Sequence, residues 1–165
     1  MNIPLRPAQT LDQLLAEARS CRACAAHLPL GPRPILQAAA TARILVVGQA
    51  PGTRAHASGI PWNDRSGERL RDWMGIDAAT FHDAHRIAIV PPGRHAQAHV
   101  LGAAAAGSVT AAVSGWRAHA PTIVPLPHPS PRNIAWFQVN PWFEAELVPE
   151  LRRQVARLTT TGLDA

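Results

Sequence analysis

Short apolar runs alternate along this chain with segments whose apolar positions recur every three or four residues. Two runs, residues 42–47 and 86–90, are rich in Ile, Val and Leu and predict buried parallel strands. A third run, residues 122–126, predicts another strand. Helical periodicity predicts helices over residues 11–19, which Thr10 can cap, and over residues 66–74.

Further helices are expected over the alanine-rich residues 94–106 and over residues 109–118. Asn140 can cap a last helix that has Pro141 in its first turn. Residues 53–63 are polar and predict a loop. Alternating strands and helices indicate a three-layer αβα fold with a short, mainly parallel central sheet.

The length indicates one domain over residues 1–165, with a core over residues 11–156 and a frayed tail after Thr159. We expect no spanning helix, because the apolar runs are far shorter than the roughly 20 residues required. Residues 1–10 lack the pattern of a signal peptide. We therefore expect a cytoplasmic monomer that does not bind membranes.

Two loops that follow predicted strands carry the candidate chemistry. After the first strand come Gly48, Gln49, Ala50, Pro51 and Gly52, and after the third come His128, Pro129, Ser130, Pro131, Arg132 and Asn133. Carboxyl ends of parallel strands lie at one edge of a sheet, where open α/β folds bind ligands. The two loops are therefore expected to meet.

The second loop is stiff, because proline fixes φ and removes a backbone donor. A rigid imidazole at His128 suits a site that must meet developing negative charge without reorganising, although a structural histidine is the ordinary alternative. The glycines of the first loop can bind a carbonyl oxygen or a phosphate, or simply form a tight turn. That loop lacks the lysine of a P-loop and the third glycine of a dinucleotide fingerprint.

Three other side chains suit nucleic acid. Trp62 is either a stacking platform for a base or a plug in a small core. Arg132 and Asn133 suit phosphate or base-edge contacts, or belong to a solvated turn. The net charge is +5 and all 16 cationic residues are arginine, which favours a polyanionic partner such as DNA.

Cys21 and Cys24 are either half of a metal site or an ordinary cysteine pair at a helix end.

Taken together, the two loops resemble motifs 1 and 2 of the uracil-DNA glycosylase superfamily. Residues 128–133 look like the second motif of the single-strand-selective monofunctional branch. The N-terminal half is similar to the iron–sulphur-containing family 4 branch, through Cys21 and Cys24, residues 48–52, and the segment from Pro61 to Gly67. The resemblance covers residues 11–155.

This resemblance implies a DNA repair hydrolase that flips uracil, or a related deaminated base, out of single- or double-stranded DNA and cuts its N-glycosidic bond. His128 would donate a hydrogen bond to uracil O2, with help from the backbone near Gln49. Trp62 would stack on the base, and residues 128–133 would wedge into the gap. A 4Fe–4S cluster would need two cysteines beyond Cys21 and Cys24, which this sequence does not contain.

The chain departs from the family pattern at several positions. Family 1 enzymes place an aspartate where this chain has Ala50, and family 4 members often have glutamate where it has Gln49. No asparagine lies near Val90 to read uracil. A few tens of residues that would hold a strand and two cysteines look absent between Pro92 and Gly93, which would leave a gap in the sheet.

Two alternatives therefore stay open. The first is a catalytically weak or inactive DNA-binding member of the same fold, suggested by Gln49, Ala50 and the apparent deletion. The second is a small α/β nucleotide-binding protein that uses residues 48–52.

Overall fold

The computed structural model describes residues 9–90 and 108–160. The described chain is a mixed α/β fold with a short parallel sheet, as the sequence predicts. The predicted helix over residues 94–106 and the tail after residue 160 lie outside the described residues.

The sheet consists, within the described ranges, of strands β1 (Ile44–Val47) and β2 (Ile87–Val90). They pair in parallel with Ile44 opposite Ile87, which confirms both predicted strands. The outer edge of β2 is covered by Gln37, whose backbone N–H and C=O both pair with Ile89. β2 is therefore the buried strand, whereas Leu45 on β1 is 59% exposed.

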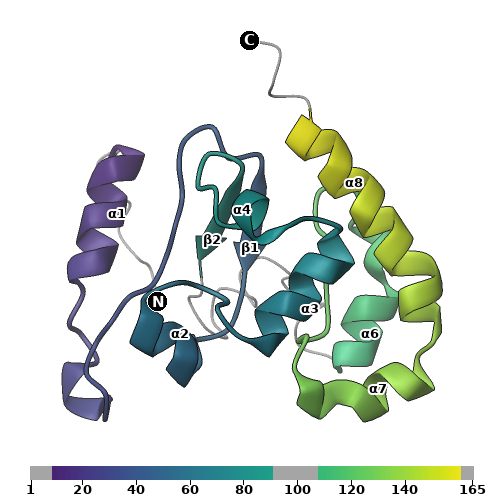
Figure 1. The fold of residues 1–165 in the computed structure, drawn as a ribbon, viewed down its shortest axis with the longest axis horizontal. Coiled ribbons are helices and arrows are strands. Elements are labelled where there is room, and N and C mark those ends of the chain that lie inside the picture. The colour runs from purple at the N-terminus through teal and green to yellow at the C-terminus, as the bar shows by residue number, and fades with distance from the viewer. Residues whose placement is uncertain (1–8, 91–107, 161–165) are drawn as a thin grey trace.

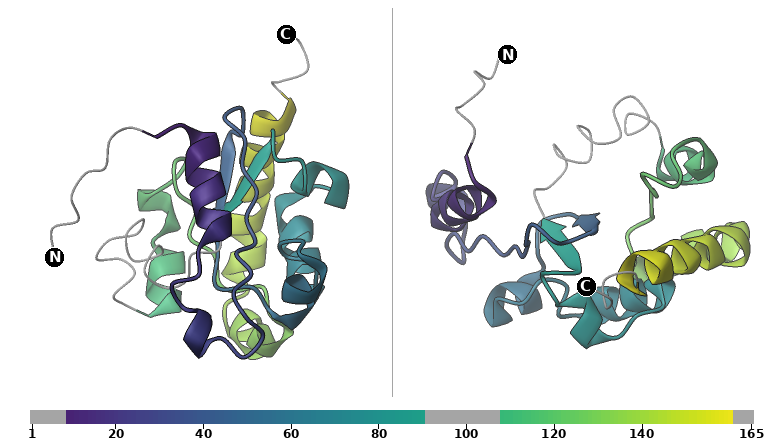
Figure 2. Two further views of the ribbon diagram at one scale, coloured as in Figure 1. Left: turned by 90° about the vertical axis from the view of Figure 1, so that its left-hand side faces the viewer. Right: turned by 90° about the horizontal axis from the view of Figure 1, so that it is seen from above.

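Helices surround this sheet on both sides (Figures 1 and 2). α1 stands on one side, and α8 lies on the other (Figures 1 and 2). The α-helices are α1 (Leu11–Ser20), α2 (Thr53–Ser58), α3 (Arg65–Met74), α4 (Ala78–Phe81), α6 (Val109–Ser114), α7 (Ile134–Val139) and α8 (Val148–Thr160). Shorter turns are η1 (Ala25–His27), η3 (Trp116–Ala118), η4 (Pro131–Asn133) and the π-helical η5 (Phe143–Leu147). None of the described helices is long and apolar enough to cross a membrane.

Where the predicted helices fall on described residues, they form, but the predicted cap at Asn140 is wrong. Asn140 ends α7, and its side chain donates to the Trp136 carbonyl oxygen at 2.8 Å and accepts from Trp142 Nε1 at 3.2 Å.

Thr10 caps α1 through a reciprocal capping box with Gln13. The predicted helix over residues 109–118 divides into α6 and η3 at Gly115. The loop prediction for residues 53–63 is wrong in part, because α2 occupies its first half.

The core lies between the sheet and the C-terminal helices. α3 contributes Leu70 and Trp73, and the last helical segment contributes Phe143 and Leu147, all 7% exposed or less. The rings of Trp73 and Phe143 meet edge to face with their centroids 4.9 Å apart. This packing fixes α3 against the C-terminal helix, and α3 in turn positions the site described below.

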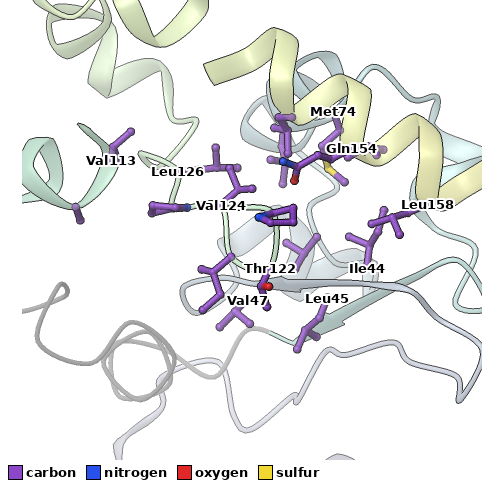
Figure 3. A pocket seen from close by; sticks show the side chains of 18 of the residues that line it. Ile44, Leu45, Val47, Met74, Val113, Thr122, Val124, Leu126, Gln154 and Leu158 are labelled. Atoms are coloured by element: carbon purple, nitrogen blue, oxygen red, sulfur yellow. The ribbon is translucent and has the colours of Figure 1, made fainter. Parts of the chain in front are cut away.

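The prediction of a third strand over residues 122–126 is wrong. This segment is only partly buried and makes no strand pairing, and Pro125 and the following Pro127 remove two of the backbone donors that a ladder needs. A cavity of about 560 Å³ is lined by β1 on one side and by residues 121–126 on another (Figure 3). The omission of a segment between Pro92 and Gly93 stays a prediction, because those residues lie outside the described ranges.

Candidate active site

The two motif loops meet through the indole of Trp62. Its ring lies 5.6 Å from the imidazole of His128, centroid to centroid, at an interplanar angle of 30°. The indole also lies against Gly48, where an added Cβ would lie only 2.9 Å from Trp62 Cζ2. Gly48 therefore allows the tryptophan to approach the end of β1, and Trp62 joins the first loop to the second.

Trp62 adopts a left-handed backbone conformation, with φ at 57°, which a bulky residue rarely adopts. The conformation is held by its surroundings. The Arg71 guanidinium donates to the Trp62 carbonyl oxygen at 3.4 Å, and His82 Nε2 lies 3.1 Å from the Pro61 carbonyl oxygen. Gly67 packs beneath the same carbonyl, where a Cβ would lie 1.8 Å from the oxygen. Such enforced strain is typical of functional sites.

The loop of His128 is braced from within. The Ser130 backbone N–H donates to His128 Nδ1 at 3.2 Å, and the Asn133 side-chain amide donates to the His128 carbonyl oxygen at 2.8 Å. The Arg69 guanidinium donates to the Ser130 carbonyl oxygen at 3.5 Å. Because Nδ1 accepts, the neutral imidazole carries its proton on Nε2 and presents a donor at that atom.

Burial lowers the pKa of His128 from its ordinary value, and the negative charge of Asp64 opposes this by raising it. The net direction is down. Protonation would also place a hydrogen on Nδ1, facing the Ser130 N–H that now donates to it. Burial and the Ser130 N–H therefore both favour the neutral imidazole, which can donate a hydrogen bond from Nε2 near pH 7.

Asp64 is a member of the site that sequence reasoning missed. It is the N-cap of α3, and its Oδ1 accepts the Gly67 backbone N–H at 2.9 Å. Its Oδ2 faces the first loop, since a Cβ added to Gly52 would lie 3.7 Å from that oxygen. An aspartate immediately before a periodic segment is a helix-start signal, which could have placed Asp64 at the start of α3. No sequence pattern could have shown that its charge acts on His128.

The remaining predicted residues of the first loop lie around this centre. Gln49 and Ala50 are exposed, and Pro51 is half-buried. Gly52 is the N-cap of α2. The Gly48 backbone N–H donates to the Val90 carbonyl oxygen at 3.2 Å, so it continues the sheet ladder and does not face a ligand.

In the second loop the predicted residues divide into two groups. Ser130 and Asn133 are half-buried and use their polar groups to hold the loop. Arg132 is exposed in η4, next to the exposed Pro131. Arg132 is therefore the residue of this loop that reaches outward with a charge.

Cys21 and Cys24 are free thiols, and both are exposed. Over residues 9–90 and 108–160, no group of three or more His, Cys, Asp or Glu side chains is arranged to hold a metal ion. A four-cysteine cluster needs four thiolates and the whole sequence supplies two, so the donors do not fit that group. The chemistry of the site therefore rests on the residues around His128.

The chain was compared with the models of known protein families. The model of the Uracil DNA glycosylase superfamily matches the chain over two overlapping segments, residues 36–91 and 78–152. The first match contains the loop of Gly48 and all of α3, and the second contains the loop of His128. Both sides of the site thus lie within the matched region.

Proposed function

We propose, because the chain belongs to the uracil DNA glycosylase superfamily, that it removes uracil or a related deaminated base from DNA by hydrolysing the N-glycosidic bond. Membership of the family supports a uracil-DNA glycosylase-like function in general. The observation that carries the finer proposal is the contact of Trp62 with His128 beside Gly48. It places a flat aromatic surface next to a neutral hydrogen-bond donor.

The first proposed step is capture of a flipped base. Extruding a base from the duplex costs a few kcal/mol. Trp62 would recover roughly 1–3 kcal/mol by stacking on the base. The Trp62 and His128 rings are already in direct contact, so the base does not enter between them. It would instead lie on the indole with one edge turned toward the imidazole.

The rest of the DNA would be held by the outer residues of the same segments. Pro131 and Arg132 are exposed at the tip of the second loop and would occupy the space that the base leaves. Arg54 and Arg65 are exposed on α2 and α3 and suit phosphate contacts. A wedge with a cation at its tip fits a duplex that has lost one stacked base.

The second proposed step is departure of the base. As the bond from C1′ to the base breaks, negative charge develops on uracil O2. The Nε2–H of His128 would donate to that oxygen, and the braced loop means that little reorganisation is needed. Water then adds to the oxocarbenium-like sugar and leaves an abasic site. No step requires a metal cluster.

The test is a cleavage assay on oligonucleotides that carry one uracil, either single-stranded or opposite guanine or adenine. We expect alkali-labile abasic sites at the uracil position and free uracil in solution. A matched oligonucleotide with thymine at that position should stay intact. If folded protein yields no abasic product from any uracil substrate, the proposal is wrong.

A second candidate is favoured by Gln49 and Ala50, which lack an acid and are both exposed. It is a weak or inactive member that binds uracil-containing DNA in a salt-dependent way without cutting it. The same oligonucleotides distinguish the two, through binding without an abasic product. The nucleotide-binding alternative is less well supported, because the Gly48 N–H is already bonded to Val90.

Cleavage should fall as the pH is lowered. The active form of His128 is neutral, and burial lowers the pKa of His128, so the loss is expected below the ordinary histidine pKa. Single-turnover rates measured between about pH 8 and pH 5 should show one protonation that reduces the rate. A rate that rises on acidification would contradict a neutral donor.

The stability of the protein should also decrease as the pH is lowered. The unfolded chain takes up the proton of His128 at a higher pH than the folded chain does, because the folded pKa is lowered. The free energy of unfolding therefore decreases as the pH falls through the ordinary histidine pKa and stops decreasing below the folded pKa. His128→Gln should remove this contribution in a comparison of urea denaturation at the two ends of the range.

A further inference from the structure

The side chain of Asp64 divides its two oxygens between two tasks. Oδ1 caps α3 by accepting the Gly67 N–H at 2.9 Å. Oδ2 lies over the end of the first loop, 3.7 Å from the position of a Cβ on Gly52. Within the described part of the chain no ion pair engages Asp64. Asp64 is half-buried, and its Oδ2 is directed at the first loop.

The negative charge of Asp64 also acts on His128, whose pKa it raises against the effect of burial. Asp64 is thus an acidic group whose field reaches the proposed leaving-group donor. Its position is fixed by two independent constraints, the cap on α3 and the packing of α3 against the core. The carboxylate is thus held in place, close enough for its charge to act on the proposed donor.

Hydrolysis of a glycosidic bond passes through an oxocarbenium-like sugar, which a carboxylate stabilises and which water must attack. At the end of β1 the chain offers Gln49, whose amide cannot accept a proton, and Ala50, which has no polar group. The first loop therefore lacks a base of its own. Asp64 reaches the same loop from α3.

We propose that Asp64 orients the attacking water and stabilises the cationic sugar, as a catalytic carboxylate supplied by the start of α3. This inference rests on the proposed function. The helix cap holds the carboxylate still through Oδ1, and Oδ2 is the oxygen that faces the reaction.

The bond from C1′ to the base breaks, and its electron pair leaves with the base, where the Nε2–H of His128 stabilises the anion. A water oxygen forms a bond to C1′ and releases a proton to Asp64 Oδ2. The carboxylic acid then returns that proton to solvent, and the uracil anion takes one up. The net reaction consumes one water and yields uracil and an abasic sugar.

The test is Asp64→Asn, which removes the charge but keeps a good N-cap, since asparagine and aspartate are nearly equivalent there. We expect the single-turnover rate of uracil excision at saturating enzyme to fall about 100-fold or more. The thermal midpoint and the affinity for DNA containing 2′-fluoro-2′-deoxyuridine, which resists cleavage, should stay at the wild-type value. The protonation that limits the rate should move to lower pH, because the carboxylate no longer raises the pKa of His128.

The matched control is Glu68→Gln, which removes an exposed acid from the first turn of the same helix and should leave the rate unchanged. If Asp64→Asn excises uracil within about threefold of wild type, the role of Asp64 is wrong and the proposed function stands. If wild-type protein does not excise uracil, the proposed function is wrong and this inference with it. Equal losses in Asp64→Asn and Glu68→Gln would also overturn the role of Asp64, because they would indicate a general effect of charge.

Discussion

Replacing His128 with alanine is expected to reduce uracil excision by about 100-fold to 1,000-fold, the usual effect of removing one donor that stabilises developing negative charge. The physical reason is the state of the imidazole. Ser130 donates to Nδ1, so the proton on Nε2 is available to uracil O2. The loss should appear in the single-turnover rate at saturating enzyme and much less in the affinity for uncleavable uracil DNA.

The control for this change is His27→Ala, which removes an exposed imidazole on η1, outside both motif loops. It should excise uracil at the wild-type rate. A His128→Ala protein that is folded and excises uracil at the wild-type rate would show that the leaving group is stabilised elsewhere. The backbone N–H groups near Gln49 would then be the next candidates.

The second large effect is expected from Gly67→Ala, which should lower the free energy of unfolding by about 3 kcal/mol or more. The added Cβ would lie 1.8 Å from the carbonyl oxygen of Trp62 and 2.7 Å from its carbonyl carbon. Both are backbone atoms, so no rotamer change can relieve the overlap. α3 or residue 62 must shift, and either movement separates Trp62 from His128.

Urea denaturation followed by circular dichroism measures this loss, and the excision rate should fall in the same variant. Gly115→Ala is the matched control, since its Cβ would meet the Ala111 carbonyl oxygen at 3.4 Å, with no left-handed backbone. It should unfold near the wild-type urea concentration. A Gly67→Ala protein as stable as wild type would mean that the contact between Gly67 and Trp62 is not required.

Local signals in the sequence determined the elements that depend on neighbours along the chain. Thr10 and Gln13 define the start of α1, and the apolar runs define β1 and β2. These predictions hold because capping, periodicity and apolar runs act over a few residues. The two motif loops do come together at Trp62, as expected. The reason given for the second loop was wrong, because residues 122–126 do not form a strand.

The errors arise where a segment depends on a distant partner. Residues 122–126 have the composition of a strand, but a strand needs a ladder, and a cavity lies between this segment and β1. α7 carries Trp136 and Phe137 without a capping side chain to mark its start. Its position follows from aromatic contacts with Trp73 and Phe143, which come from other parts of the chain.

The sequence by itself thus determined the strands, most helices and the pair of loops that carries the family resemblance. Only the tertiary structure decided how those loops form one site. The left-handed Trp62, the tautomer of His128 and the approach of Asp64 to Gly52 each depend on contacts between α3, the end of β1 and residues 128–133. Such contacts join residues far apart in the chain, and their geometry is set by packing, which leaves no local pattern to read.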